Sequence, residues 1–291
     1  MIPNTLKQHI AQLMNSQIIT TSSVGGGDIS KAAQLSLSDG RQLLLKWRPR
    51  AVPTMFTTEA KGLTLMREAA HSLVVPEVFA AEESDGTRPA FILMAWLGRA
   101  NRSTGMGTAL GRGLADMHRV SSPTYGLDHD NFIGANPQRN SQHDNWVDFF
   151  REERIVYQME LAGQNRYLNR QRQKQLDRLL VRLNDLLPPN PPISLLHGDL
   201  WGGNWLVTET GQPALIDPAV YYGDREAELA FTELFGGFPS DFYRAYNESW
   251  PLDAGYAERK TLYNLYHLLN HLNLFGEGYG GRVDSILRRY A

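Results

Sequence analysis

The chain has 291 residues, of which 42% are hydrophobic, and this is enough to bury the core of one large domain or of two lobes. Its formal net charge of -2 provides no excess of basic residues for a phosphate backbone, so nucleic acid is not an expected partner. The absence of cysteine excludes disulfides, thiolate metal sites and cysteine nucleophiles.

The start of the chain predicts an amphipathic helix. MIPNTLKQHIAQLMN places Leu6, Ile10 and Leu13 on one helical face, and it lacks the continuous apolar stretch of a secretory signal. The longest apolar run, residues 90–97, is too short to cross a bilayer, which takes about 20 residues in a helix. We therefore expect a soluble, cytoplasmic protein with no membrane partner.

The first third of the chain predicts a small lobe that is rich in strands. A turn-rich loop at residues 21–30 precedes the strands, and a helix is expected at residues 57–71 with Thr57 or Thr58 as its cap. Strands are expected at residues 33–38, 41–47, 74–84 and 88–97.

Beyond residue 98 helical periodicity dominates. Helices are expected at residues 108–118, 146–164, 170–187, 225–235 and 257–274. The exception is a β-insert at residues 193–217, where the short strands ISLL, NWLV and PALI flank a polar loop. The sequence thus predicts an α+β fold, with a strand-rich N-lobe at residues 1–97 and a larger helical C-lobe at residues 98–291 that carries the β-insert.

The polar loop HGDLWGGN, residues 197–204, combines the residue types that phosphoryl transfer needs. Asp199 precedes Asn204 by five residues, and Asp217 directly follows an apolar strand. In a kinase-type loop the first aspartate orients the attacking hydroxyl and takes its proton, while the asparagine and the second aspartate hold Mg²⁺. We therefore predict Asp199 as the catalytic base and Asn204 and Asp217 as metal ligands. The alternative is that Asp199 and Asn204 only form turns.

The N-lobe carries three further kinase features in the required order. They are a glycine run at residues 25–27, Lys46 at the end of an apolar strand, and Glu59 in the following helix. Each is weak alone, because a glycine run is also typical of flexible turns and a glutamate early in a helix is favoured by the helix dipole. The prediction of a kinase rests on all six features occurring in one order.

Three long motifs resemble the fructosamine kinase family, whose members are also called ketosamine-3-kinases. The motifs are LLHGDLWGGNW, LIDPAVYYGDREAELAFTELFGGF and LYNLYHLLNHLNLFGEGY, and the resemblance runs from about Ile18 to the end of the chain. It implies a protein-kinase-like fold of the aminoglycoside phosphotransferase type, ATP with Mg²⁺, and transfer to the 3-hydroxyl of a ketosamine. The 3-phosphate is unstable and releases the free amine, so the implied activity is deglycation. Bacterial-type members often prefer ribulosamine- or erythrulosamine-like acceptors to fructosamines.

The resemblance also implies roles for individual residues of the nucleotide site. Lys46 would hold the donor phosphates with Glu59 as its partner. Separately from the resemblance, the place of Trp201 two residues after the predicted base indicates that it packs on the acceptor sugar. Backbone groups are expected to contact the phosphates at Gly25, Gly26, Gly27, Asp28 and Ile29, and to contact adenine at Met94, Ala95 and Trp96.

Two positions depart from the family pattern. Asp28 stands where some relatives carry a cysteine that permits redox control, so that control is not expected here. An acid at this position should repel the phosphates unless its side chain points away. Ala95 stands where relatives often have glutamate, which changes the side-chain environment beside the adenine site.

Two other functions stay open on the sequence alone, as does the oligomeric state. An aminoglycoside- or choline-type kinase would need acids for its cationic acceptor, and GDREAELAFTE supplies Asp224, Glu226, Glu228 and Glu233. A nucleotide-binding pseudokinase that regulates a partner is disfavoured, because the lysine, the base and the metal ligands are all retained.

Three histidines could in principle bind a metal or act in catalysis, but structural roles are favoured for them. His267 and His271 lie four residues apart on a predicted helix, but packing is favoured over a metal pair because HExxH is not matched. His197 is expected to support the catalytic loop by hydrogen bonds, because Asp199 already serves as base.

Overall fold

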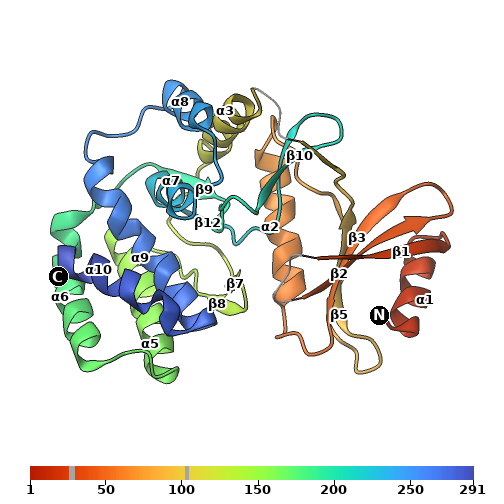
Figure 1. Cartoon of the computed structure of the whole chain (residues 1–291), viewed down its shortest axis with the longest axis horizontal. Coiled ribbons are helices and arrows are strands. Elements are labelled where there is room, and N and C mark those ends of the chain that lie inside the picture. The colour runs from red at the N-terminus through yellow and green to blue at the C-terminus, as the bar shows by residue number, and fades with distance from the viewer. Residues whose placement is uncertain (26–29, 102–104) are drawn as a thin grey trace.

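The computed structural model describes residues 1–25, 30–101 and 105–291. Its five-stranded sheet and its group of helices lie at opposite ends of the molecule, as do the two termini (Figure 1). Helix α2 (Met55–Ala69) lies between them. Among the described residues, no helix combines the length and apolar character that crossing a membrane would require.

The strands at the N-terminal end form one antiparallel sheet of order β1-β2-β3-β5-β4. Its strands are β1 (Ile18–Val24), β2 (Lys31–Leu37), β3 (Gln42–Arg48), β4 (Val78–Glu82) and β5 (Ala90–Ala95). The four predicted strands are confirmed. The predicted loop at residues 21–30 is wrong over Thr21–Val24, because these residues pair with β2 in β1.

Helices cover both faces of this sheet. Phe91 and Leu93 of β5 pack in the cluster that holds Leu6 and Ile10 of α1 (Asn4–Leu13), whereas Ile92 packs in the cluster of α2. Successive strand residues point to opposite faces, so a strand covered on both sides is continuously apolar. This explains the unbroken run AFILMA in β5.

The start of α2 differs from the prediction. The helix begins at Met55, and Thr54 occupies the N-cap position. Neither Thr57 nor Thr58 is the cap, because both hydroxyls donate to the carbonyl of Thr54 instead of accepting from the helix amides.

The C-terminal end is built from helices around a second core. The helical elements are α3 (Met106–His118), α4 (Trp146–Phe149), the π-helical turn η1 (Phe150–Val156), α5 (Tyr157–Gln164), α6 (Arg170–Leu186), α7 (Arg225–Leu234), α8 (Ser240–Ser249), α9 (Tyr256–Phe275), η2 (Glu277–Tyr279) and α10 (Gly280–Tyr290). The five predicted helices are confirmed within a few residues. The prediction had no helix at α8, whose buried apolar positions are few: Phe242, Ala245 and Tyr246.

Seven short strands lie outside the N-terminal sheet in the described part of the chain, and two of them, β9 and β10, flank the polar loop. They are β6 (Arg99–Ala100), β7 (Asn131–Ile133), β8 (Asn136–Gln138), β9 (Ile193–Leu196), β10 (Trp205–Thr208), β11 (Pro213–Leu215) and β12 (Tyr221–Asp224). The three predicted strands exist, but they do not form one sheet: β10 pairs with β11 and β6, whereas β9 pairs with β12. The polar loop therefore links two separate sheets.

Candidate active site

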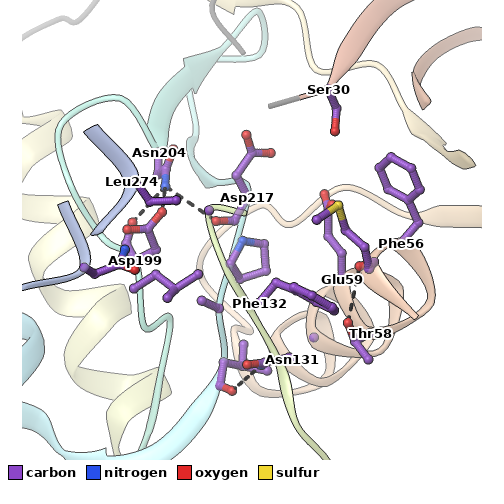
Figure 2. Close-up of a pocket in the computed structure, with 18 of the residues that line it drawn as sticks. Ser30, Phe56, Thr58, Glu59, Asn131, Phe132, Asp199, Asn204, Asp217 and Leu274 are labelled. Carbon is purple, nitrogen blue, oxygen red and sulfur yellow. Dashed lines mark hydrogen bonds between the residues drawn. The ribbon is translucent and has the colours of Figure 1, made fainter. Parts of the chain in front are cut away.

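A cleft of about 270 Å³ receives side chains from both ends of the molecule. Lys46 and Glu59 line it from β3 and α2, while Asp199, Asn204 and Asp217 line it from the loops around β10 and β11. Figure 2 shows Asn204 between Asp199 and Asp217, with Glu59 across the cleft. Residues separated by more than 150 positions in the chain thus meet in one cavity.

His197 fixes the start of the polar loop. It is fully buried, and its Nε2 lies 2.9 Å from the carbonyl oxygen of Ile216. A carbonyl can only accept, so Nε2 carries the proton and Nδ1 accepts from the N–H of Asp199 at 3.2 Å. Burial lowers the pKa of His197 and thereby favours this neutral form. These contacts agree with the predicted supporting role.

Glu228 of α7 holds the next residue of the loop. Its Oε1 accepts from the N–H of Gly198 at 2.7 Å, and its Oε2 lies 2.8 Å from Nε2 of His118. Burial would raise the pKa of Glu228, but the hydrogen bond and the electrostatic effect of His118, followed by His197 and the N–H of Gly198, outweigh it, and the pKa is lowered. A buried, ionised carboxylate thus anchors the backbone next to Asp199.

Asn204 and Asp199 are joined directly. The Nδ2 of Asn204 donates to the carbonyl oxygen of Asp199 at 2.8 Å and to its Oδ2 at 3.1 Å. The amide oxygen Oδ1 is therefore the atom that Asn204 would offer to a cation. Burial, followed by the charge of Asp217, raises the pKa of Asp199 well above its ordinary value.

Asp217 adopts a left-handed backbone conformation with a φ of 57°. Such a conformation costs a non-glycine residue roughly 1–3 kcal/mol and is typical of functional sites. Its Oδ1 accepts from Nζ of Lys46 at 2.6 Å, and the same Nζ lies 2.7 Å from Oε1 of Glu59. Burial alone would lower the pKa of Lys46, but the two carboxylates outweigh it and raise the pKa above its ordinary value.

The oxygen atoms around Asn204 and Asp217 suit a hard cation that shares its coordination with phosphates. One carboxylate oxygen of Asp217 and the amide oxygen of Asn204 face the same cleft. In the described part of the chain, no group of three His, Cys, Asp or Glu side chains could hold a metal without further ligands. This is the donor set expected for a kinase metal, which takes one or two protein ligands plus substrate phosphates.

Comparison with known proteins identifies the family. A family model for fructosamine kinase matches residues 1–291, the whole chain. The chain belongs to the fructosamine kinase family. This confirms the resemblance found in the sequence.

Similar proteins cover nearly the full length of this family member. It is 39% identical over 287 residues to "Probable ketoamine kinase" of Lactiplantibacillus plantarum, covering 98% of this chain and 99% of that one. It is 38% identical to "Protein-ribulosamine 3-kinase, chloroplastic" of rice (Oryza sativa), covering 94% of this chain and 79% of that one. A solved structure from Thermobifida fusca, described as a candidate fructosamine-3-kinase, superposes with a TM-score of 0.89 at 28% identity and covers 98% of both chains.

The family membership confirms the predicted fold and reaction class. The fold is α+β and protein-kinase-like, and the chain is a phosphotransferase that acts on a hydroxyl group of ketosamines. ATP as the donor and a divalent metal ion follow from membership of a kinase family.

The acidic residues that could bind a cationic acceptor form hydrogen bonds and ion pairs with other residues of the chain instead. Asp224 caps α7 and accepts from the hydroxyl of Tyr263 at 2.5 Å. Glu226 forms two 2.8 Å bonds with Arg259, and Glu233 lies 2.5 Å from Nζ of Lys260. Neither these three nor Glu228 is among the described residues that line the cleft. The specific basis for an aminoglycoside- or choline-type acceptor site is therefore absent from the cleft.

The predicted nucleotide-contacting residues fall into three groups. Gly26, Gly27, Asp28 and Ile29 lie outside the described residues. Gly25 directly follows β1 and is not among the described residues that line the cleft. Met94, Ala95 and Trp96 are not brought into the lining of the cleft.

Two of the backbone N–H groups at the predicted adenine-contacting segment already have partners. The N–H of Ala95 donates to the carbonyl of Glu77 at 2.8 Å, and that of Trp96 donates to the carbonyl of Gln42 at 3.0 Å. Both donors therefore have partners in the folded chain, and the contact of other backbone groups of Met94, Ala95 and Trp96 with adenine stays a prediction.

Trp201 is 43% exposed and lines the cleft. A Cβ on Gly203 would lie 2.4 Å from the Trp201 indole, so the glycine at this position lets the ring fold back over its own loop. The ring thus lines the same cleft as Asp199, and the sequence predicts that it packs on the sugar there.

The far wall of the cleft contains residues that were not predicted from the sequence. This wall comes from the β7–β8 hairpin at residues 131–134 and from Asn270, His271 and Leu274 of α9. The available signals were Gly134, which turns the hairpin with a φ of 64°, and the polar pair Asn270-His271 inside an apolar helix. His267 does not form a metal pair with His271, because it is buried face to face on Phe231 with ring centroids 3.5 Å apart.

Proposed function

We propose that the protein transfers the γ-phosphoryl group of Mg²⁺-ATP to the 3-hydroxyl of a ribulosamine, an amine glycated by a five-carbon sugar. The observation that carries the proposal is the meeting of Lys46, Glu59, Asp199, Asn204 and Asp217 in one cleft. The ribulosamine acceptor is supported by the name of the rice relative, protein-ribulosamine 3-kinase. The 3-phosphate of such a sugar is unstable, so the transfer leads to release of the amine.

Asp199 is the proposed base. It lines the cleft, and burial, followed by the charge of Asp217, raises its pKa, which makes its carboxylate a stronger base than an exposed aspartate. The carboxylate accepts the proton of the 3-hydroxyl as that oxygen bonds to the γ-phosphorus. The bond between the γ-phosphorus and the bridging oxygen breaks, and ADP leaves with the electron pair. Asn204 holds Asp199 in place through its amide Nδ2.

Lys46 is proposed to hold the donor phosphates, with Glu59 as the partner that positions it. Its Nζ already lies between two carboxylates at 2.6 and 2.7 Å, so its charge and location are fixed before ATP binds. We further propose that backbone groups of Gly25, Gly26, Gly27, Asp28 and Ile29 contact the phosphates.

The division into lobes is also a proposal. We propose that the N-lobe comprises residues 1–97 and the C-lobe residues 98–291.

Mg²⁺ is the proposed metal, held by Oδ1 of Asn204 and the carboxylate of Asp217. When bound, the cation neutralises charge that develops on the phosphoryl oxygens. The contribution of this chain is to keep two hard oxygen donors within the same cleft as the base.

The experiment measures ADP release with Mg²⁺, ATP and Nα-acetyl-Nε-ribulosyl-lysine for the wild type and Asp199→Asn. The variant keeps the shape of the side chain and its contact with Asn204 but cannot accept the proton. We expect kcat to fall by roughly 10²–10⁴-fold, the usual contribution of a positioned base, with ATP binding retained. A variant that turns over as fast as the wild type would show that Asp199 is not the base.

A further inference from the structure

Asp217 has a backbone conformation that its neighbours must enforce. Its φ of 57° is left-handed, and it directly precedes Pro218, a position at which the chain is normally extended. Such a conformation costs a non-glycine residue free energy, so it persists only where the surrounding structure fixes it. The contacts on either side of Asp217 therefore decide where its carboxylate points.

The catalytic loop fixes the residue before Asp217. The N–H of Ile216 donates to the carbonyl oxygen of Asn204 at 3.0 Å, and the carbonyl oxygen of Ile216 accepts from Nε2 of His197 at 2.9 Å. Beyond Asp217, the N–H of Ala219 donates to the carbonyl oxygen of His197 at 2.8 Å. The carbonyl groups that follow Asp217 have their partners in another part of the chain.

The β7–β8 hairpin holds these carbonyl groups through two amide side chains. Nδ2 of Asn131 donates to the carbonyl oxygen of Val220 at 2.8 Å, and Nε2 of Gln138 donates to that of Ala219 at 2.9 Å. Asn131 and Gln138 are 4% and 1% exposed. Hydrogen bonds in such a dry environment are strong, and the loss of a donor leaves a buried carbonyl without a partner.

A buried polar network fixes the orientation of both amides. A carbonyl oxygen can only accept, so the donor ends of Asn131 and Gln138 are the ends that face the segment after Asp217. The Oδ1 of Asn131 accepts from Nε2 of Gln138 at 2.8 Å and from Nδ2 of Asn140 at 3.0 Å. The Oε1 of Gln138 accepts from the hydroxyl of Tyr266 at 2.6 Å. Neither amide can turn over without breaking bonds to its neighbours.

The network ends at a buried cation. Arg154 of the π-helical turn η1 is fully buried, and its Nη2 donates to Oδ1 of Asn140 at 2.9 Å. The guanidinium of Arg154 lies 4.0 Å from the centroid of the Tyr221 ring, and Tyr221 directly follows Val220. A hydrogen bond from a charged donor is stronger than one between neutral groups. The network is thus anchored at one end by Arg154 and at the other by the segment after Asp217.

We propose that Asn131 and Gln138 are positioning residues for the metal ion, because they hold the segment after Asp217 and so keep its carboxylate directed into the cleft. The inference rests on the proposed role of Asp217 as a metal ligand and deepens it. Asn131 lies in the same pocket as Asp217 (Figure 2), but it acts through the backbone of Val220. Without these two amides, the backbone of Asp217 relaxes toward the extended conformation that is typical before a proline. Its carboxylate then no longer shares a site with the amide oxygen of Asn204.

The test replaces each amide by an uncharged side chain of similar size, in Asn131→Leu and Gln138→Met. Asn273→Leu is the matched control, because it removes an amide-to-carbonyl hydrogen bond of 2.9 Å at Gln158, outside the segment around Asp217. Asp217→Asn tests the metal ligand itself. For each protein the Kd of Mn²⁺, which replaces Mg²⁺, is measured by electron paramagnetic resonance with the non-hydrolysable ATP analogue AMP-PNP present, and the Tm is measured as a check.

Asn131→Leu and Gln138→Met should each raise the Kd of Mn²⁺ roughly 10- to 100-fold, the usual effect of removing a group that orients a metal ligand. Their activity should be low at limiting Mg²⁺ and should recover at high Mg²⁺, which a general loss of structure would not do. Asn273→Leu should keep the wild-type Kd. An unchanged Kd in both folded hairpin variants, or a loss of activity that excess Mg²⁺ does not restore, would overturn the inference.

Hydrogen exchange of the wild type decides the inference if the hairpin variants do not fold. The N–H groups of Ile216 and Ala219 lie on either side of Asp217. With no metal added, both should exchange as slowly as the N–H groups of strand β5, because the hairpin rather than the cation holds the segment. Rapid exchange that becomes slow only after Mn²⁺ and AMP-PNP are added would contradict this.

Failure of the proposed metal role gives a different pattern. Asp217→Asn would then bind Mn²⁺ as tightly as the wild type, and the inference would fall with that role. If Asp217→Asn weakens Mn²⁺ binding while Asn131→Leu and Gln138→Met do not, only the positioning role of the hairpin is wrong. The titration uses no acceptor, so its result does not depend on whether a ribulosamine is the substrate.

Discussion

Gly198 is the residue whose replacement tests the geometry of the catalytic loop most sharply. It directly precedes Asp199, has a φ of 81°, and donates its N–H to Glu228 at 2.7 Å. A Cβ at this position would lie 1.9 Å from the carbonyl oxygen of Ala219. Because that atom is backbone, Gly198→Ala must shift either the loop or the segment that contains Ala219.

The expected cost has two parts that can be separated. A left-handed conformation costs a residue with a Cβ roughly 1–2 kcal/mol, and overpacking a filled site adds about 1–3 kcal/mol. Gly211 supplies the matched control, because its φ is 76° and a Cβ there would meet nothing within 4 Å. Gly211→Ala should therefore show the backbone cost alone, and Gly198→Ala should lose roughly 2–5 kcal/mol in total.

The assay is urea denaturation of both variants and the wild type, followed by steady-state kinetics on the folded proteins. Gly198→Ala should be the less stable variant, and its kcat should fall by roughly 10²-fold, because a displacement of about 1 Å of a catalytic group has that effect. Gly211→Ala should keep full activity. Equal stability of the two variants, together with an unchanged kcat for Gly198→Ala, would refute the steric argument.

Two further predictions concern buried charges. Lys46→Met should lower kcat/KM for ATP roughly 10²–10³-fold, because it removes the cation held between Glu59 and Asp217; unchanged ATP kinetics would contradict this. Burial, followed by the charge of Glu226, raises the pKa of Asp224 from 3.8 to about 6, so its protonated form stabilises the fold below about pH 4 and this contribution is lost as the pH rises through about 6. Relative to Asp224→Asn, which stays neutral, the wild type should lose up to about 3 kcal/mol of unfolding free energy between pH 4 and pH 7. A pH-independent difference would show that Asp224 is not perturbed.

The catalytic loop could be predicted from the sequence because its information is local. The interval from His197 to Asp217 fixes the order of base, amide and second carboxylate along one short segment. The covering helices and strands were also recognisable, since α9 and β5 carry strong apolar patterns. That Lys46 and Asp217, 171 residues apart, belong to one site followed only from the general order of kinase features, and the direct contact between them was not predicted.

The far wall of the cleft, formed by the β7–β8 hairpin and α9, could not be predicted because its contacts are long-range. Oδ1 of Asn270 accepts from Gln158 and Asn136, which are 112 and 134 residues away in the chain. Long-range contacts also explain an expectation that the structure does not support. The acidic run at residues 224–233 suggested a binding site for a cationic acceptor. In the folded chain, Arg259 forms an ion pair with Glu226 and Lys260 forms one with Glu233. These pairings could not be predicted from the sequence.

The central claim is tested most directly by the structure of the product. Wild-type protein is incubated with ATP, Mg²⁺ and Nα-acetyl-Nε-ribulosyl-lysine, and the product is followed by two-dimensional ³¹P–¹H NMR and mass spectrometry. The account predicts a phosphate coupled to the proton on C3, followed by the appearance of free Nα-acetyl-lysine, with neither seen for Asp199→Asn. A phosphate on another hydroxyl, or ADP formed without any sugar phosphate, would contradict it.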